Sequence, residues 1–205
     1  MNYYIGFKRI TDFIFALLLL IIVLPIMLIA AILIKIESEG PVLFRQERPG
    51  KDAKIFKVNK FRTMRVETEI NGRLITDKER ITKVGGFLRK TSIDELPQLF
   101  NILKGEMSFI GPRPLLIQYL KYYNSEQMRR HEVTPGISGW AQVNGRNTIS
   151  WEEKFKYDIY YVDNAGLLLD LKIVWLTFYK VLNRKDINNS KNYTMPCFTG
   201  NRDNE

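Results

Sequence analysis

Cysteine and histidine are nearly absent from this sequence. Cys197 is the one cysteine among 205 residues, so neither a disulfide framework nor a thiolate metal site is available. His131 is the one histidine, which excludes histidine-rich zinc sites and allows a Ser-His-Asp triad only through that residue. We therefore expect a reducing, cytosolic environment, and we expect carboxylates to carry any acid–base or nucleophilic chemistry.

Negative charge is also scarce. The chain has 31 Lys and Arg residues against 22 Asp and Glu residues, a net charge of +9. This excess favours polyanionic partners such as nucleic acid, nucleotide phosphates or an anionic membrane face, and it does not choose among them. The length suits one domain with an appendage.

Charge of either sign is missing from residues 13–34, FIFALLLLIIVLPIMLIAAILI. The run is about as long as a helix needs to span a hydrocarbon core of roughly 30 Å, which predicts membrane association. A buried helix of a soluble protein fits so long an uncharged run poorly. No small-x-small cleavage site precedes the charged sequence that follows, so we expect the segment to stay in the mature protein.

Pro25 stands near the middle of this apolar segment. Proline lacks the backbone N–H, and in an ordinary helix interior it costs about 3 kcal/mol. Basic residues flank both ends, with Lys8 and Arg9 before the segment and Lys35 first among many after it. Because the positive-inside tendency keeps both flanks in the cytoplasm, we favour a re-entrant helix–break–helix over a plain transmembrane helix, in which proline is also tolerated.

The remaining chain has the mixed pattern of a small soluble domain. Apolar and basic residues alternate over 54–64, which predicts a short strand, and Asn71-Gly72 predicts a turn or hairpin. Helical periodicity covers 125–132, 151–161 and 170–183. The last of these is amphipathic and would pack on the domain or lie in the membrane interface.

Two adjacent carboxylates, Asp94 and Glu95, stand in the stretch TSIDELPQLF. A capping box from Ser92 to Glu95 would place Pro97 at the fifth helical position, where an N–H is needed. With Asp94 as the N-cap, Pro97 falls in the first turn and LPQLFNIL continues the helix. The helix terminus would favour the ionised carboxylate, so Asp94 would be a nucleophile, a metal ligand or simply a cap.

Arginine and glycine gather around this pair in the sequence. Arg89 precedes it, and GPRP at 111–114 holds Arg113 between two prolines, whose stiff backbone fixes where the guanidinium points. The Gly-rich segment 134–147 carries Arg146 near its end. One arginine alone is usually a solvated surface charge, but the planar fork suits phosphate, and the density of such residues indicates an anionic ligand.

The order of these motifs resembles a known family. Residues 5–182 resemble the bacterial monotopic phosphoglycosyl transferases, and most of all their small single-domain members, among them the transferase of phospho-diacetylbacillosamine to undecaprenyl phosphate in bacterial N-glycan assembly. The motifs that carry the resemblance are FKRITDF, the proline-broken apolar segment, GPVLFRQERPG, IFKVNKFRTM, LRKTSIDELPQLFNILKGEMSFIGPRPL, PGISGWAQVNGRN and WEEKFKYDIYYV.

The resemblance implies a reaction and roles for particular residues. It implies transfer of sugar-1-phosphate from a UDP-sugar, expected to be N-acetylated, to polyprenyl (undecaprenyl) phosphate, with release of UMP. It implies that Asp94 is the nucleophile, forming a covalent phosphosugar intermediate in a ping-pong sequence. It also implies that Glu95 is the partner carboxylate and that Asp94 and Glu95 associate with Mg²⁺. The residues expected to contact substrate are Arg89, Arg113, Arg146, Lys60 and Arg62.

The expected fold class is α+β, with a re-entrant membrane hairpin joined to a small, mainly helical catalytic domain that has a short β element and interfacial amphipathic helices. Expected boundaries are 1–36 for the membrane helix, 37–185 for the catalytic domain and 186–205 for a flexible polar tail. We expect a monotopic protein of the bacterial inner (cytoplasmic) membrane whose catalytic domain faces the cytosol. Its expected partners are membrane lipid and downstream glycosyl transferases, and not nucleic acid.

One departure and two rival functions stay open. Small family members often have Ser-Pro at the membrane break, whereas this chain has Leu24-Pro25, and leucine cannot satisfy a freed carbonyl. The first rival is a membrane-bound glycosyl transferase that moves the sugar without its phosphate, with Asp94 and Glu95 as metal ligands. The second is a membrane-anchored protein that binds nucleic acid or anionic lipid, which leaves the Asp-Glu pair unexplained.

Overall fold

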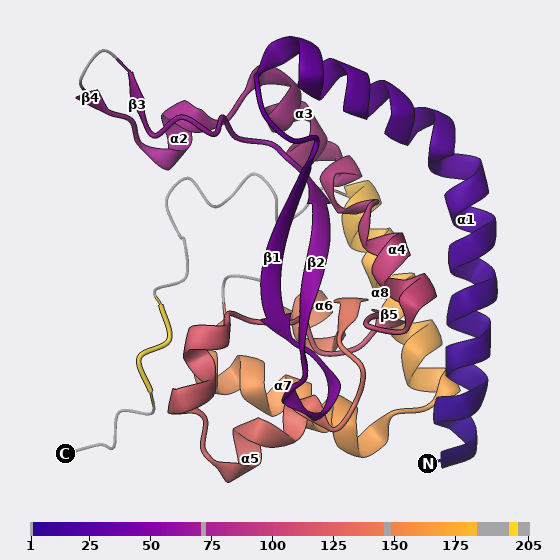
Figure 1. The fold of residues 1–205 in the computed structure, drawn as a ribbon. Coiled ribbons are helices and arrows are strands. Elements are labelled where there is room, and N and C mark those ends of the chain that lie inside the picture. The colour runs from indigo at the N-terminus through magenta and orange to yellow at the C-terminus, as the bar shows by residue number, and fades with distance from the viewer. Residues whose placement is uncertain (1, 71–72, 146–148, 184–196, 201–205) are drawn as a thin grey trace. The chain divides into compact units, whose positions relative to one another are not determined.

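The structure is a computed structural model that describes residues 2–70, 73–145, 149–183 and 197–200. Contacts divide the chain into two compact units, whose elements are labelled in Figure 1. Unit 1 comprises Met1–Asp12, Glu47–Phe56 and Gly105–Glu205, and unit 2 comprises Phe13–Gln46 and Lys57–Lys104. The predicted mixture of helices and short strands is confirmed.

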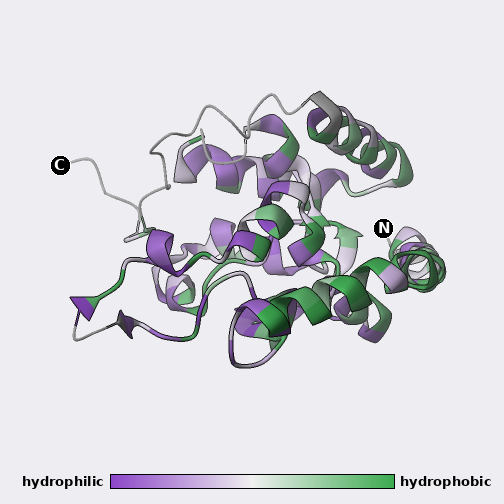
Figure 2. Cartoon of the chain, turned by 90° about the horizontal axis from the view of Figure 1, so that it is seen from above, coloured by the Kyte–Doolittle hydropathy of each residue, from purple (hydrophilic) through white to green (hydrophobic). Residues whose placement is uncertain are grey.

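The apolar segment forms part of one long helix, α1 (Asn2–Glu37). By length and composition this helix could cross a membrane, and most of its large apolar side chains are exposed. Its ribbon in Figure 2 is mostly green, the colour of hydrophobic residues. The predicted break at Pro25 is not found, because the helix runs through the proline; Figure 1 draws α1 as unbroken and bent. Bending is a common response of a helix to an internal proline. The re-entrant path stays a prediction.

Unit 2 packs the C-terminal half of α1 against a strand and a helix. Met27, Ala30 and Ile34 of α1 form a buried cluster with Phe61 and Leu88. The elements of this unit and its border are β1 (Leu43–Pro49), β2 (Ile55–Phe61), β3 (Glu69–Ile70), β4 (Arg73–Leu74), α2 (Asp77–Arg80), α3 (Lys83–Thr91), the 3₁₀ turn η2 (Ile93–Glu95) and α4 (Gln98–Lys104).

The strand signals in the sequence are confirmed. β2 lies within the predicted strand at 54–64 and pairs with β1 in a two-stranded sheet. β3 and β4 pair antiparallel, with Glu69 opposite Leu74. This pairing accords with the predicted hairpin, although Asn71-Gly72 itself lies outside the described residues.

Unit 1 is built around a short parallel strand pair and two long helices. β5 (Ser108–Ile110) pairs with β6 (Gly136–Ser138), and its core joins Ile110 to Val143, Tyr161 and Ile173. The other elements are η1 (Lys51–Ala53), η3 (Ile117–Tyr122), α5 (Ser125–Met128), η4 (Arg129–His131), α6 (Trp140–Asn144), α7 (Trp151–Asn164) and α8 (Leu167–Asn183). The predicted helices at 151–161 and 170–183 are confirmed, whereas 125–132 is divided between α5 and η4.

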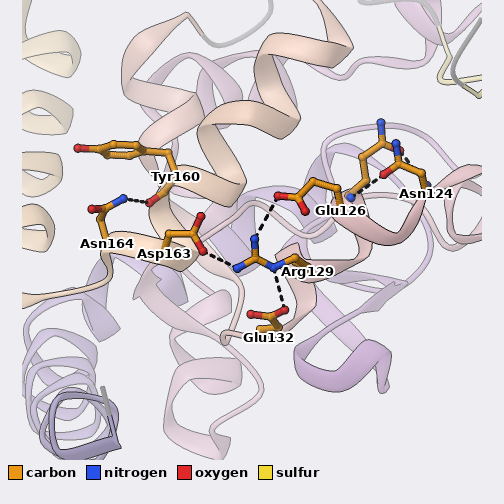
Figure 3. Close-up of polar contacts among 8 residues, drawn as sticks. Asn124, Glu126, Arg129, Glu132, Tyr160, Asp163 and Asn164 are labelled. Atoms are coloured by element: carbon orange, nitrogen blue, oxygen red, sulfur yellow. Dashed lines mark hydrogen bonds and ion pairs between the residues drawn. The ribbon is translucent and has the colours of Figure 1, made fainter.

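Two arginines attach η4 to α7. Arg130 is buried and bonds the carboxylate of Asp158, with Nε and Nη2 at 3.1 and 2.7 Å from Oδ2. On the surface, the neighbouring Arg129 contacts Glu126, Glu132 and Asp163 at once (Figure 3). The buried pair fixes the backbone of η4 against the long helix.

One part of the expected flexible tail packs on the domain. Of residues 186–205, the structure describes 197–200, and there Phe198 is buried, with its ring 5.1 Å from Phe155 and 5.4 Å from Trp151. The polar composition of the tail gave no sign of this contact, because one aromatic residue carries it.

Candidate active site

Asp94 lies in the short 3₁₀ turn η2, between α3 and α4 of unit 2. Helix α3 ends at Thr91, and its C-cap residue Ser92 adopts a left-handed conformation with φ of 58°. The chain then turns tightly, with the N–H of Glu95 bonded to the carbonyl of Ser92 at 3.2 Å. This reversal leaves the carboxylate of Asp94 half-buried.

The prediction that Asp94 caps a helix is wrong. Helix α4 begins at Gln98, four residues after Asp94, and η2 has Ser92 at its N-cap position without a side-chain capping bond. Pro97 immediately precedes α4, so its missing N–H costs the helix nothing, as the sequence argument required. Tertiary packing moved the helix start beyond the carboxylate pair, which removes the capping explanation for Asp94.

Charge around Asp94 comes from one neighbouring carboxylate and two bases. Lys60 of β2 forms an ion pair with Glu95, with 2.6 Å between Nζ and Oε1. Burial raises the pKa of the Asp94 carboxyl above its ordinary value, and the charge of Glu95 raises it further, while Lys60 and Arg89 oppose that rise. This is the reverse of the pKa depression expected from a helix terminus. It means that ionised Asp94 is held in an unfavourable environment.

Arg89 is held by a contact between α3 and the segment that follows β2. The guanidinium Nε of Arg89 donates to the hydroxyl of Thr63 at 2.8 Å. This contact is possible because α3 approaches the end of β2 closely at Gly85, where an added Cβ would lie 2.0 Å from the carbonyl oxygen of Thr63. Unit 2 thus contains four of the predicted site residues: Asp94, Glu95, Lys60 and Arg89.

Two buried asparagines, which the sequence analysis missed, hold β2 against α4. Asn101 of α4 is fully buried; its side-chain oxygen accepts bonds from the backbone and side chain of Asn59 at 3.0 Å, and its amide donates to the carbonyl of Lys57 at 2.7 Å. Buried amides are costly unless satisfied, so this network fixes the register of the strand that carries Lys60. Asparagine in an apolar helical pattern was the available signal.

The other predicted contact residues have different surroundings. Arg62 is buried, and its guanidinium donates to the backbone carbonyls of Ser38, at 2.8 Å, and Glu39. These bonds hold the chain after α1, and the substrate contact expected of Arg62 from sequence stays a prediction. Arg113 belongs to unit 1, and Arg146 lies outside the described residues.

His131 has the surroundings of a structural residue. It is buried, with Nδ1 3.1 Å from the carbonyl oxygen of Gly50. Burial lowers the pKa of His131 to about 4, and the charge of Arg130 acts in the same direction. The imidazole is therefore neutral at physiological pH, and the expectation that carboxylates carry the chemistry stands as a prediction.

The residues present suit a magnesium ion held with the help of a substrate. Among the described residues, no group of three or more His, Cys, Asp or Glu side chains is placed to hold a metal. Mg²⁺ commonly uses one or two carboxylates and takes its other ligands from water and substrate phosphates. Asp94 and Glu95 supply two carboxylates, and a cation there would offset the repulsion between them.

Comparison with known proteins places the chain in a family. The model of the family described as "Bacterial sugar transferase" matches residues 3–184. The chain belongs to the bacterial sugar transferase family. The match covers α1 and nearly all the described elements of both units, and it agrees with the extent of the resemblance found in the motifs.

Several relatives are 40 to 50% identical to this chain over the aligned residues. It is 50% identical, over 96% of its length and 97% of the relative's, to "Uncharacterized sugar transferase EpsL" of Bacillus subtilis (strain 168). It is 46% identical to "UDP-glucose:undecaprenyl-phosphate glucose-1-phosphate transferase" of Klebsiella pneumoniae, over 85% of the chain and 40% of that protein. It is 43% identical to "UDP-N-acetylgalactosamine-undecaprenyl-phosphate N-acetylgalactosaminephosphotransferase" of Aeromonas hydrophila, over 87% of the chain and 44% of that protein. The chain thus spans less than half the length of the two relatives whose names state a reaction.

Proposed function

We propose that this protein transfers sugar-1-phosphate from a UDP-sugar to undecaprenyl phosphate and releases UMP. The observation that carries the proposal is the Asp94 carboxylate, which caps no helix yet lies half-buried beside Glu95, close to the charges of Lys60 and Arg89. Such a carboxylate adds no stability to the fold. Its place beside positive charges suits an aspartate that attacks a phosphate. The names of the Klebsiella and Aeromonas relatives support the same class of reaction.

The reaction we propose proceeds by two displacements at phosphorus. An Asp94 oxygen attacks the phosphate attached to the sugar, a new O–P bond forms, and the bond between that phosphorus and the UMP oxygen breaks, so that UMP leaves. A phosphate oxygen of undecaprenyl phosphate then attacks the aspartyl phosphosugar, and the Asp94 O–P bond breaks. Two steps let the soluble donor leave before the lipid acceptor arrives, which gives ping-pong kinetics.

The raised pKa of Asp94 has a place in this chemistry. A carboxylate of higher pKa binds phosphorus more strongly than an ordinary one, and removal from water strengthens its interaction with a nearby electrophile. Lys60 and Arg89 counter the rise in the pKa of Asp94, which favours the ionised carboxylate that the attack requires. Arg89 would also contact the donor phosphates, with Arg113 and Arg146 as further contacts.

Asp94 and Glu95 are the residues that would hold Mg²⁺. When bound with the donor, Mg²⁺ neutralises pyrophosphate charge and stabilises departing UMP. Glu95 already pairs with Lys60, so in the absence of substrate this lysine offsets part of the charge at the site.

Contacts at the two ends of α1 support a re-entrant path. Near its start, Tyr4 and Lys8 both bind the carboxylate of Asp170 in α8, Tyr4 at 2.6 Å. At its end, Glu37 accepts bonds from the backbone N–H groups of Lys83, at 2.6 Å, and Val84, at 2.8 Å, at the start of α3. Each end therefore contacts its own compact unit.

The two ends of α1 lie on the same side of a membrane unless a second spanning helix separates the residues that they contact. From the end of α1 at Glu37 to Asp170 in α8, the described part of the chain has no second helix apolar and long enough to span a membrane. Both ends of α1 would therefore lie on the same side, which the positive-inside tendency makes the cytosol of the bacterial inner membrane. The exposed apolar side chains of α8, such as Leu168, Trp175 and Phe178, suit the membrane interface.

The donor sugar is a separate question from the reaction. The named relatives include glucose and N-acetylgalactosamine transferases, so their names do not favour the N-acetylated sugar that the motifs suggested. We keep an N-acetylated donor as a hypothesis, with downstream glycosyl transferases that extend the lipid-linked product.

The deciding experiment follows the phosphate. Purified protein in lipid discs is given Mg²⁺, undecaprenyl phosphate and a panel of UDP-sugars labelled in the phosphate next to the sugar. We expect the label in the lipid fraction and UMP in solution, with the active donor identifying the sugar. Sugar in the lipid fraction with the label left on UDP would establish the rival glycosyl transferase instead.

A further inference from the structure

Three basic side chains from separate elements of unit 1 lie near one another. Arg48 is at the end of β1, Arg113 follows β5, and Lys154 is in the first turn of α7. Arg48 Nη1 is 3.5 Å from the carbonyl oxygen of Pro114, the residue next to Arg113. All three side chains are half-buried. We call this group the basic cluster.

The backbone beneath the basic cluster is held rigidly. Arg113 lies between Pro112 and Pro114, and its carbonyl oxygen accepts a 2.8 Å bond from Nη2 of Arg130. Arg130 is in turn bound to Asp158, and both side chains are almost wholly buried, at 2% exposure each. This buried pair fixes the backbone that carries Arg113, and the guanidinium itself donates through Nη1 to the carbonyl oxygen of Ile137 at 3.4 Å.

Electrostatic repulsion acts within the basic cluster. Burial lowers the pKa of Arg48, and the charge of Arg113 lowers it further. Burial also lowers the pKa of Lys154, and the charges of Arg130 and Arg113 act in the same direction while Asp158 opposes them. Folding has therefore concentrated positive charge in a partly dehydrated place, where an anion is bound more strongly than on an open surface.

Aromatic rings stand beside the cations. The Nζ of Lys154 lies 4.6 Å from the centre of the Trp151 ring, and Tyr119 meets the same ring edge to face at 5.3 Å. Both rings are packed in the aromatic cluster of Phe155 and Phe198, so the contact with Trp151 holds Lys154 in place.

We infer that Arg48, Arg113 and Lys154 form a phosphate-binding site that takes the uridine nucleotide of the donor. The inference rests on the proposed function for its ligand and adds Arg48 and Lys154 to the residues that recognise the donor. The fork of each arginine suits phosphate oxygens, and the lysine adds a third positive charge. The site belongs to unit 1, and its recognition role is separate from the attack by Asp94.

UMP binding tests the site without requiring turnover. The full-length protein in detergent is titrated with UMP by calorimetry, in wild type and in Arg48→Gln, Arg113→Gln and Lys154→Gln variants. Loss of one charge-assisted contact should weaken UMP binding by roughly tenfold or more in each variant. The matched controls are Arg45→Gln on β1 and Lys156→Gln on α7, which remove the same charge from exposed positions of the same elements and should leave binding unchanged.

Kinetics show whether the basic cluster binds the phosphates of the UDP-sugar or the phosphate of the lipid. A rise in KM for the UDP-sugar with KM for undecaprenyl phosphate unchanged supports the inference, and the reverse pattern overturns it. Unchanged UMP affinity in all three variants, with folding verified by circular dichroism, also overturns it. If the variants weaken UMP binding but wild type transfers no labelled phosphate, the site stands and the proposed reaction fails.

Discussion

Neutralising Asp94 should stabilise the protein while abolishing its activity. Asparagine has the shape of aspartate without its charge, so Asp94→Asn removes a half-buried carboxylate whose pKa is raised first by burial and then by Glu95. Because the folded state holds this proton more tightly than the unfolded state, wild-type stability falls as pH rises from the ordinary value of 3.8 through the raised pKa. The advantage of the asparagine variant should thus be full at neutral pH and vanish in acid.

The size of this effect follows from the exposure of the site. A fully buried pair of like charges would cost several kcal/mol, but water reaches Asp94 and screens part of the interaction, so we expect a gain on the order of 1 kcal/mol. For a chain of this size, that corresponds to a rise in Tm of about 2–4 °C. Removal of the nucleophile should lower kcat by roughly 10⁴-fold or more.

The assay compares melting curves of wild type, Asp94→Asn and Asp94→Ala in the same detergent at several pH values, alongside the labelled-phosphate assay. Asp94→Ala should not destabilise the protein, because η2 has no side-chain capping bond to lose. A cap lost to alanine would instead lower stability by about 1 kcal/mol. A Tm for Asp94→Ala several degrees below wild type, or full activity in Asp94→Asn, would refute the reasoning.

Three further predictions concern the surroundings of Asp94 and the membrane helix. Lys60→Gln removes a charge that lowers the pKa of Asp94, so the acidic limb of the kcat/KM profile should move to higher pH, whereas Lys57→Gln, exposed on the same strand, should leave the profile in place. Gly85→Ala should cost about 1–3 kcal/mol or more by denaturant melting, because its Cβ would meet the Thr63 carbonyl at 2.0 Å; Gly86→Ala, whose nearest contact is 3.9 Å, should instead gain about 0.5–1 kcal/mol, and equal effects would contradict this packing. Pro25→Ala should straighten α1 and expose the N-terminus on the far side of the membrane. A cysteine introduced at residue 2 reports this by its accessibility to labelling, and finding it on the cytosolic side in that variant would count against the proposed bend.

The sequence predicted the elements that local pattern controls. The apolar segment, β2, α7 and α8 were found because their periodicity and composition are set by which faces must be buried or face lipid. The start of α4 was misplaced, because Ser92 takes a left-handed conformation that turns the chain into η2 before the helix begins. Local capping rules do not contain the tertiary contacts that stabilise such a turn.

The candidate site was predicted in part. Motif resemblance named Asp94, Glu95, Lys60 and Arg89, and the fold brings these four into one unit. Arg62, also expected to contact substrate, binds backbone carbonyls, and its substrate contact stays a prediction. Nothing in residue type separates an arginine that binds phosphate from one that binds carbonyls. Arg48 and Lys154 were missed as binding residues for a related reason: they come together only when β1 and α7 do.

By itself, the sequence predicted membrane association from one long uncharged run, turned attention from its scarce cysteine and histidine to carboxylates, and placed a carboxylate pair near several arginines. These conclusions depend on composition and short spacing, which do not change on folding. Only the tertiary structure decided that Asp94 is held at raised pKa, that Asn101 fixes the strand bearing Lys60, and that Gly85 sets how closely α3 approaches. Each of these depends on distances between residues far apart in the chain, and burial and charge act through those distances.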